Sequence, residues 1–225
     1  MKKTEAQFVK SEEAIAKIRE GGKLLGEILE KVSLIVKPGL STKALDEFAE
    51  ALIIAAGGRP AFLGYKISSQ IPSYPATLCV SVNDEVVHGI PRADHLLKEG
   101  DIVGLDIGME WPYKKGGPAG FYTDTAMTVP VGKISKEDEL LLERTRGALF
   151  AGIAAAKAGG DVRDISRATE NYLKPFGYGI VEDLVGHGVG YAVHEEPQVP
   201  NYLHRRAQSV PLVPNMVLAL EPFRF

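Results

Sequence analysis

The sequence contains a single cysteine, Cys79, among its 225 residues. One cysteine excludes an intrachain disulfide and any zinc site built from several cysteines, and it fits a reducing compartment. The chain also lacks an apolar run of the roughly 18 residues that a membrane-spanning helix needs. Its basic start is followed by no apolar segment of the kind found in signal peptides. We therefore expect a cytoplasmic protein that does not cross a membrane.

The sequence has no strong excess of charge of either sign, with 26 basic and 29 acidic residues. No long basic run predicts a nucleic-acid partner, and no acidic tail predicts an interaction arm. Hydrophobic residues make up 45% of the chain, which is enough to bury one sizeable core at this length. We expect one domain, or two halves that share a core.

The pattern of apolar residues predicts a helix–helix–strand order that occurs twice. Ser11 is predicted to cap a helix that ends before residues 37–39, and Ser41 or Thr42 opens a second helix that stops at residues 57–58. The other expected elements are strands at 77–82, 101–108, 121–131 and 217–225, and helices from Ser135 to about 159 and over 162–176. This order predicts an α+β fold of two related halves, with helices covering one face of a curved, mostly antiparallel sheet.

Two aspartates interrupt the predicted apolar strands. Asp106 lies in the run 101–108, which reads as a strand buried on both faces, where an unpaired carboxylate is costly. Asp124 lies within the strand predicted at 121–131. Either aspartate alone is also compatible with hydrogen bonds to backbone amides or with solvent exposure. Two such carboxylates on adjacent strands repel each other unless a divalent cation lies between them, so the pair favours a metal site.

Two histidines and their neighbours form a second cluster of polar residues. His187 lies between glycines in GHGVG (186–190), and the alternative to a metal ligand is a turn histidine. His194 begins HEEP (194–197), whose spacing and proline do not fit the helical His-Glu-x-x-His zinc motif. Glu195 and Glu196 are adjacent in sequence, so at most one points inward on a strand, and we expect one solvated and one ion-paired glutamate.

Two further candidates are Glu221 and His88. Glu221 interrupts the apolar strand predicted at 217–225, and His88 ends an apolar arm at 86–91, where a surface role is equally compatible. Two aspartates, one histidine and one glutamate on separate strands provide carboxylate and imidazole ligands that suit Mn, Fe(II), Co or Zn. Two such ions polarise a carbonyl group and lower the pKa of a bound water. His88 and His194 would remain as proton donors near the substrate.

From about Ser11 to Phe225 the chain resembles type I methionine aminopeptidase, a pita-bread metallopeptidase. The resemblance is carried by YPATLCVSVN (74–83), HGIP (88–91), GDIV (100–103) with Asp106, Asp124-Thr125, GHGVG, HEEP and LEP (220–222). It implies the pita-bread fold and two divalent metal ions. Asp106 would chelate one ion, Asp124 would bridge both, and His187 and Glu221 would hold the other.

The same resemblance implies roles at the substrate. Glu221 would also accept a proton from the attacking water. His194 would contact the scissile amide and stabilise the tetrahedral intermediate, with His88 assisting at the same place. Tyr65 and Cys79 would line the pocket for the methionine side chain.

The chain departs from the family pattern at two places. Asp106 and Asp124 are 18 positions apart, a longer interval than in the family, because residues 110–120 insert a loop rich in Trp, Lys and Gly. The family also continues past the Glu-Pro strand to a hairpin whose glutamate bridges both metals, and this chain does not supply it. The domain expected over residues 1–225 is therefore a single one that is incomplete at its C-terminal end.

Three functions follow from these observations. The first is removal of the initiator methionine from peptides or nascent chains by a monomeric enzyme, with ribosome association as one option. The second is a proline-specific aminopeptidase of the same fold, which the type I motifs disfavour. The third is a non-catalytic module that binds peptides or proteins, because four ligands hold one metal but organise two poorly.

Overall fold

The computed structural model describes residues 8–66, 70, 72–204 and 207–222 of the chain. The chain divides into two compact units. Unit 1 comprises Met1–Ile15, Glu139–Gly190 and His194–Phe225, and unit 2 comprises Ala16–Asp138 and Tyr191–Val193. In the part that the structure describes, no helix is long and apolar enough to cross a membrane.

Unit 2 contains an antiparallel sheet in which β3 (Ile102–Trp111) is central. Strand β4 (Phe121–Pro130) pairs with β3 over its whole length, from Ile102 opposite Pro130 to Trp111 opposite Phe121. Strands β2 (Leu78–Val82) and β1 (Arg59–Pro60) also pair with β3, at different positions along it. The order of neighbours therefore differs from the order in sequence, and residues from three separate segments meet on β3.

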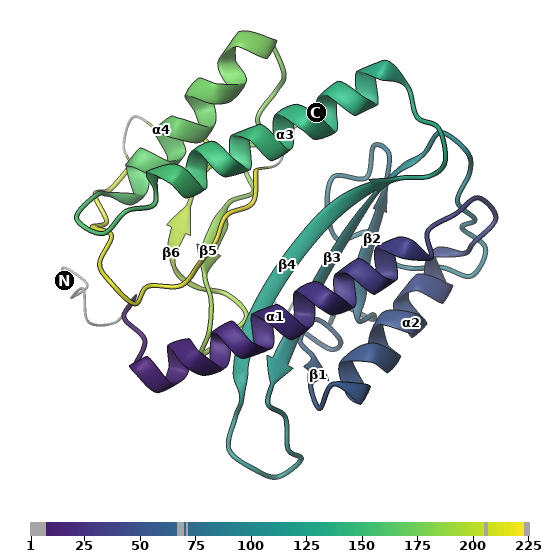
Figure 1. Cartoon of the computed structure of the whole chain (residues 1–225), viewed down its shortest axis with the longest axis horizontal. Helices are drawn as coiled ribbons and strands as arrows, with labels where there is room; N and C mark the ends of the chain where they lie inside the picture. The colour runs from purple at the N-terminus through teal and green to yellow at the C-terminus, as the bar shows by residue number, and fades with distance from the viewer. Residues whose placement is uncertain (1–7, 67–69, 71, 205–206, 223–225) are drawn as a thin grey trace. The chain divides into compact units, whose positions relative to one another are not determined.

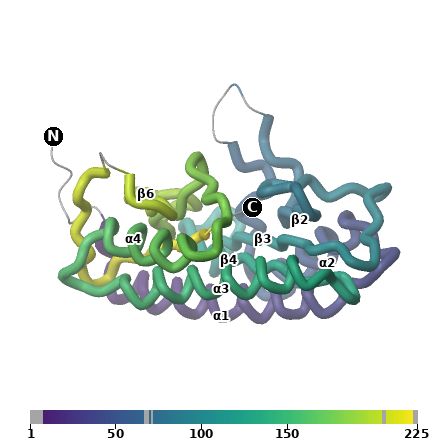
Figure 2. Tube along the Cα trace, turned by 90° about the horizontal axis from the view of Figure 1, so that it is seen from above, coloured from purple at the N-terminus to yellow at the C-terminus, as the bar shows by residue number. Residues whose placement is uncertain are grey.

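The helices α1 (Glu12–Leu34) and α2 (Thr42–Ala55) supply the core of unit 2. The part of α1 in this unit lies with α2 on the same side of the sheet (Figures 1 and 2). Alternate residues of β3 point toward these helices and are fully buried: Val103, Leu105, Ile107 and Met109. They pack with Leu25, Leu29, Val32, Leu45, Ala49 and Ile53 from the helices. These β3 residues alternate along the strand, so they share the face that packs on the helices. The residues between them lie on the opposite face of the sheet, away from this core.

Unit 1 is built on helices α3 (Lys136–Ala155) and α4 (Val162–Leu173), followed by a 3₁₀ turn at Lys174–Phe176. Its three short strands are β5 (Gly186–Gly188), β6 (Glu195–Val199) and β7 (Leu218–Ala219), in the antiparallel order β6-β5-β7. Its buried apolar cluster contains Val162, Ile165, Val199 and Leu212.

The starts of α2 and α4 repeat one another 120 residues apart. Gly39 and Gly159 both have a left-handed φ, +83° and +85°, and each N–H donates over 2.8 Å, to Leu97 O and Leu212 O respectively. The buried positions of α2 are Thr42, Leu45, Asp46, Ala49 and Ile53, and those of α4 are Val162, Ile165, Ser166, Thr169 and Leu173. Each buried residue of α4 follows its counterpart by the same 120 positions. The predicted relation between the two halves therefore extends to individual buried positions, although few of the residues at these positions are identical.

Several predicted boundaries are confirmed and others change. Ser11 accepts from Ala14 N–H, Ser41 from Ala44 N–H and Ser135 from Asp138 N–H, so all three predicted caps are present. The strand predicted at 217–225 is wrong in length: β7 covers only Leu218–Ala219, and residues 223–225 lie outside the described chain. Its partner β5 has three residues and an irregular register between His187 and Gly188, so it offers β7 few pairing positions.

Candidate metal centre

Asp106 and Asp124 lie on one face of the unit 2 sheet. Asp106 pairs with Ala126 and with Cys79, and Asp124 pairs with Gly108 two positions along. Residues directly opposite in an antiparallel pair share a face, so the two aspartates are diagonal neighbours on the face turned away from Val103, Leu105 and Ile107. Both are partly exposed, which corrects the expectation of a strand buried on both faces. We call this surface, with Cys79, Asp106 and Asp124, the aspartate face.

The residues predicted to line a methionine pocket gather beside the aspartate face. Phe62, Cys79 and Val193 are buried together, and Tyr65, Tyr74 and Tyr122 pack against them. Burial raises the pKa of the Cys79 thiol, and the negative charge of Asp106 raises it further. Tyr65 and Cys79 therefore belong to one largely apolar cluster in unit 2, as a pocket for an apolar side chain requires.

His88 is exposed and lies beside strand β2. Its φ of 57° is in the left-handed region, which is uncommon for a residue with a Cβ atom. The next residue is held tightly: Gly89 O accepts from Val80 N–H at 2.9 Å, and Gly89 N–H donates to Ser81 Oγ at 3.1 Å. The backbone next to His88 is thereby held against the strand that carries Cys79.

His187 is buried at the centre of the unit 1 sheet. A Cβ atom at Gly186 would collide with Ala219 O of β7, and one at Gly188 would collide with Glu196 O of β6. Strands on both sides therefore approach the backbone more closely than any other residue type permits. The two glycines that flank His187 therefore allow β6 and β7 to pack closely against the strand that carries the imidazole.

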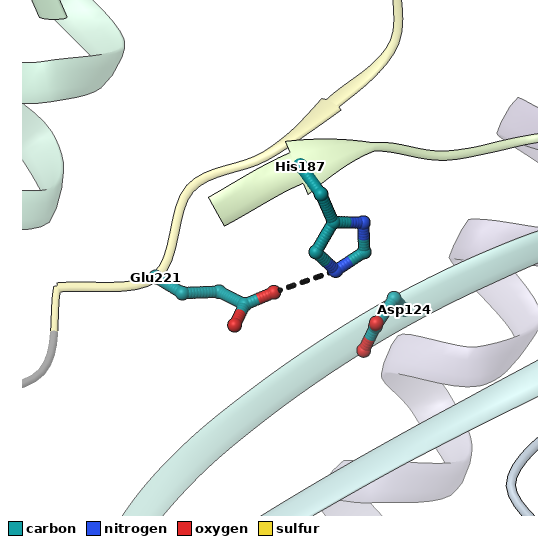
Figure 3. Close-up of side chains that lie close together, drawn as sticks. All are labelled: Asp124, His187 and Glu221. Carbon is teal, nitrogen blue, oxygen red and sulfur yellow. Dashed lines mark ion pairs between the residues drawn. The ribbon is translucent and has the colours of Figure 1, made fainter. Parts of the chain in front are cut away.

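His187 and Glu221 meet in unit 1. His187 Nε2 lies 3.0 Å from Glu221 Oε1, and the other ring nitrogen, Nδ1, lies 2.9 Å from Gly188 O (Figure 3). With the proton on Nδ1 donated to this carbonyl, the lone pair of Nε2 faces the carboxylate. A backbone carbonyl in this position is typical of metal-binding histidines. Asn201 Nδ2 donates to Glu221 O at 2.6 Å and holds the segment that follows β7.

The donor chemistry of these residues fits a divalent cation. In unit 1 an imidazole nitrogen and a carboxylate oxygen converge, and in unit 2 two carboxylates share a face. A lone pair and a carboxylate at 3.0 Å repel unless a proton or a cation lies between them. Glu221 lies beyond β7 and its side chain is 27% exposed, so the prediction of a buried mid-strand glutamate is wrong in this detail.

His194 is exposed and lies next to His187, with ring centroids 4.4 Å apart. The following residue, Glu195, pairs with the buried Lys10 at a distance of 2.5 Å, whereas Glu196 is exposed. The expected ion pair is therefore present at Glu195, and Glu196 is the exposed member of the two. Sequence reasoning missed Lys10, because nothing near it in the chain indicates a partner 185 residues away.

The predicted loop at 110–120 is in part an extension of the β3–β4 hairpin. Glu110 and Trp111 belong to β3, and only residues 112–120 leave the sheet. Trp111 Nε1 donates to Ala56 O at 3.1 Å, and Tyr113 N–H donates to Gly57 O at 2.9 Å. The insertion is therefore tied to the end of α2, a role that its polar and glycine-rich composition did not indicate.

Residues 16–224 match metallopeptidase family M24. The chain is also 42% identical over 214 residues to a methionine aminopeptidase of Borreliella burgdorferi, covering 95% of this chain and 80% of that protein. The chain belongs to metallopeptidase family M24. Methionine aminopeptidase 1 of Bacillus subtilis is 40% identical over 91% of this chain and 77% of its own length.

Solved structures place this M24 chain in the same fold. Methionine aminopeptidase from Thermotoga maritima has a TM-score of 0.85 and 34% identity, covering 95% of this chain and 80% of that one. The prolidase from Pyrococcus horikoshii has a TM-score of 0.79 at 22% identity over 96% of this chain and 56% of its own, a likeness of fold alone. The predicted α+β pita-bread fold is confirmed.

Proposed function

We propose that this M24 chain is a methionine aminopeptidase that hydrolytically removes N-terminal methionine from peptides and nascent chains in the cytoplasm. The observation that carries the proposal is the 42% identity to a methionine aminopeptidase over 95% of the chain. The chemistry of the candidate residues supports it, because carboxylates and an imidazole are suited to divalent metals of the first transition row.

Asp106, Asp124, His187 and Glu221 are the proposed ligands of two divalent cations, which would be Co, Mn, Fe(II) or Zn. When bound, the cations supply positive charge that polarises the scissile carbonyl and makes water a nucleophile near neutral pH. Asp106 and Asp124 contribute two negative charges from one face, and Asp124 is the proposed bridging ligand. His187 contributes a neutral nitrogen whose orientation Gly188 O fixes.

The remaining residues act on the proton and on the substrate. Glu221 is the proposed acceptor of the proton of the attacking water. His194 and His88 are the proposed donors to the scissile amide, and both are exposed in their units, as a group that meets a peptide must be. Tyr65 and Cys79 are the proposed pocket for the methionine side chain, supported by their shared apolar cluster.

A peptidase assay tests the proposal. With Mn²⁺ or Co²⁺ added, the chain is expected to release methionine from Met-Gly and Met-Ala peptides, and chelation is expected to stop the release. An Ala-Pro peptide serves as the matched substrate for proline specificity, the alternative activity. Cleavage only ahead of proline, or peptide binding without turnover under any divalent metal, would refute the assignment.

A further inference from the structure

Glu110 is a third acidic residue on the aspartate face, and Arg59 balances its negative charge. Its side chain is 4% exposed and accepts a hydrogen bond from Arg59 Nε at 2.7 Å, and Arg59 Nη2 lies 2.5 Å from the same carboxylate oxygen as its ion-pair partner. A third donor is Gly120 N–H, at 2.9 Å. With both oxygens engaged by a guanidinium and an amide, Glu110 is a structural anion rather than a metal ligand.

These contacts close the β3–β4 hairpin around the inserted residues. Gly120 is the last residue before β4, and a Cβ atom there would lie 2.5 Å from Pro112 O and 3.1 Å from Glu110 Cγ. Arg59 also stacks on the ring of Tyr113 at 5.1 Å and reaches Tyr122 Oη at 3.4 Å. Both ends of the insertion therefore meet at one ion pair.

The beginning of β4 connects this ion pair to the candidate centre. Phe121 contacts the ring of Tyr191, with centroids 5.9 Å apart, and Tyr122 packs on the cluster that contains Cys79 and Val193. Asp124 follows two residues after Tyr122 on the same strand. A shift at Gly120 would thus move the carboxylate of Asp124 relative to Asp106, because the strand transmits it directly.

We propose that Glu110 is a positioning residue for metal binding: paired with Arg59, it fixes the start of β4 and thereby the position of Asp124. This inference rests on the proposed function. It assigns a role to the residues that flank the insertion, because the ion pair ties the end of the β3–β4 ladder at the point where pairing stops, at Trp111 and Phe121. Outer-shell partners of metal ligands commonly change metal affinity by tenfold or more when removed.

The test is a Mn²⁺ titration by calorimetry on the wild-type chain and three variants. Glu110→Ala is expected to raise the Kd for Mn²⁺ at least about tenfold. Gly120→Ala keeps the ion pair but places a Cβ atom against Pro112 O and Glu110 Cγ, which pushes residue 120 away from Glu110. It is also expected to raise the Kd for Mn²⁺. Fluorescence of Trp111, the single tryptophan, reports whether the hairpin remains folded in each variant.

Asp161→Ala is the matched control. Asp161 likewise accepts from an arginine through two side-chain donors and one backbone N–H, all of Arg163, at 2.7, 3.2 and 2.9 Å. It lies in unit 1 at the start of α4, so its loss is expected to lower stability but to change the Kd for Mn²⁺ by less than about twofold. Unchanged Mn²⁺ binding by Glu110→Ala, or an equal loss in Asp161→Ala, would overturn the inference. Failure of the wild-type chain to bind Mn²⁺ would instead refute the proposed function, and this inference with it.

Discussion

Lys10 forms an ion pair with Glu195 in unit 1, with Nζ and Oε2 2.5 Å apart and the lysine side chain 2% exposed. The two residues are separated by 185 positions in sequence. Lys10 N–H also donates to Asn215 O at 2.8 Å, so the backbone at this point is held as well. Glu195 directly follows His194, and the pair therefore anchors the segment on which a proposed substrate-contacting histidine lies.

Replacing this lysine is expected to destabilise unit 1. Lys10→Met keeps much of the aliphatic length but removes the positive charge that lies beside the largely buried carboxylate of Glu195. The free energy of unfolding should fall by about 3 kcal/mol, measured by urea denaturation. Adding Glu195→Gln should recover part of the loss, because a carboxylate that has lost this ion pair is replaced by a neutral amide.

Lys17→Met is the control for this substitution. Lys17 and Glu20 form an exposed pair at 3.4 Å, with side chains 42% and 56% exposed. Its loss should cost less than about 0.5 kcal/mol. An equally small effect of Lys10→Met would contradict the proposed anchoring role.

Metal content should depend on Asp124. Asp124→Asn keeps the shape of the side chain but removes the negative charge, so the chain is expected to retain less Mn²⁺ after dialysis, as measured by elemental analysis. Asp94→Asn is a suitable comparison, because Asp94 is 87% exposed and pairs only loosely with Arg92 at 3.5 Å. Equal metal content in the two variants would exclude Asp124 as a ligand.

Stability of unit 2 should depend on Asp46, which joins α2 to the sheet. Its buried carboxylate accepts from Thr77 N–H at 2.8 Å and from Leu78 N–H at 3.0 Å. Asp46→Ala leaves both buried donors unsatisfied and should cost about 3 kcal/mol in thermal or urea unfolding. The counterpart in α4 is Ser166, whose Oγ makes one long bond of 3.4 Å to Val162 O. Ser166→Ala should cost less than about 1 kcal/mol. A larger loss of stability in Ser166→Ala than in Asp46→Ala would contradict this prediction.

A pH dependence is expected at the start of α4. Burial by itself would raise the pKa of Asp161, but hydrogen bonds from Arg163 and Ser209 outweigh it, and the pKa falls below the ordinary 3.8. A carboxyl group whose pKa is lowered in the folded state stabilises that state at pH values above its unfolded pKa. This stabilisation is lost as the pH falls. Wild type should therefore be more stable than Asp161→Asn at neutral pH, and urea unfolding should show the gap closing below about pH 4. A gap that stays constant into acid would contradict the assignment.

Local features of the fold could be predicted from the sequence. Ser11, Ser41 and Ser135 cap helices because a side-chain hydroxyl satisfies an N–H within three residues, which short patterns reveal. The placement of Asp106 and Asp124 on adjacent strands also followed, since a carboxylate within an apolar run is conspicuous. These predictions need only neighbours in sequence.

Features that depend on distant partners could not be predicted. Glu110 was assigned to a surface loop because its glycine- and lysine-rich neighbours read as polar, whereas its partner Arg59 lies 51 positions earlier. The length of β7 was overestimated because the apolar run after Val217 does not show that β5 is short. The repeat between α2 and α4 appears in the sequence only as a coarse order of elements. The two helices share their buried positions but not the residues at those positions.

The division into units has a consequence for the order of folding during synthesis. Unit 2 is almost entirely the continuous stretch Ala16–Asp138, whereas unit 1 joins the segment that contains Lys10 to residues made after Asp138. At about 5–20 residues per second, Glu195 is added roughly 10–40 seconds after Lys10. Most of unit 2 can fold on the ribosome during that interval. The Lys10 side chain, which is buried in the folded chain, stays hydrated until Glu195 is made.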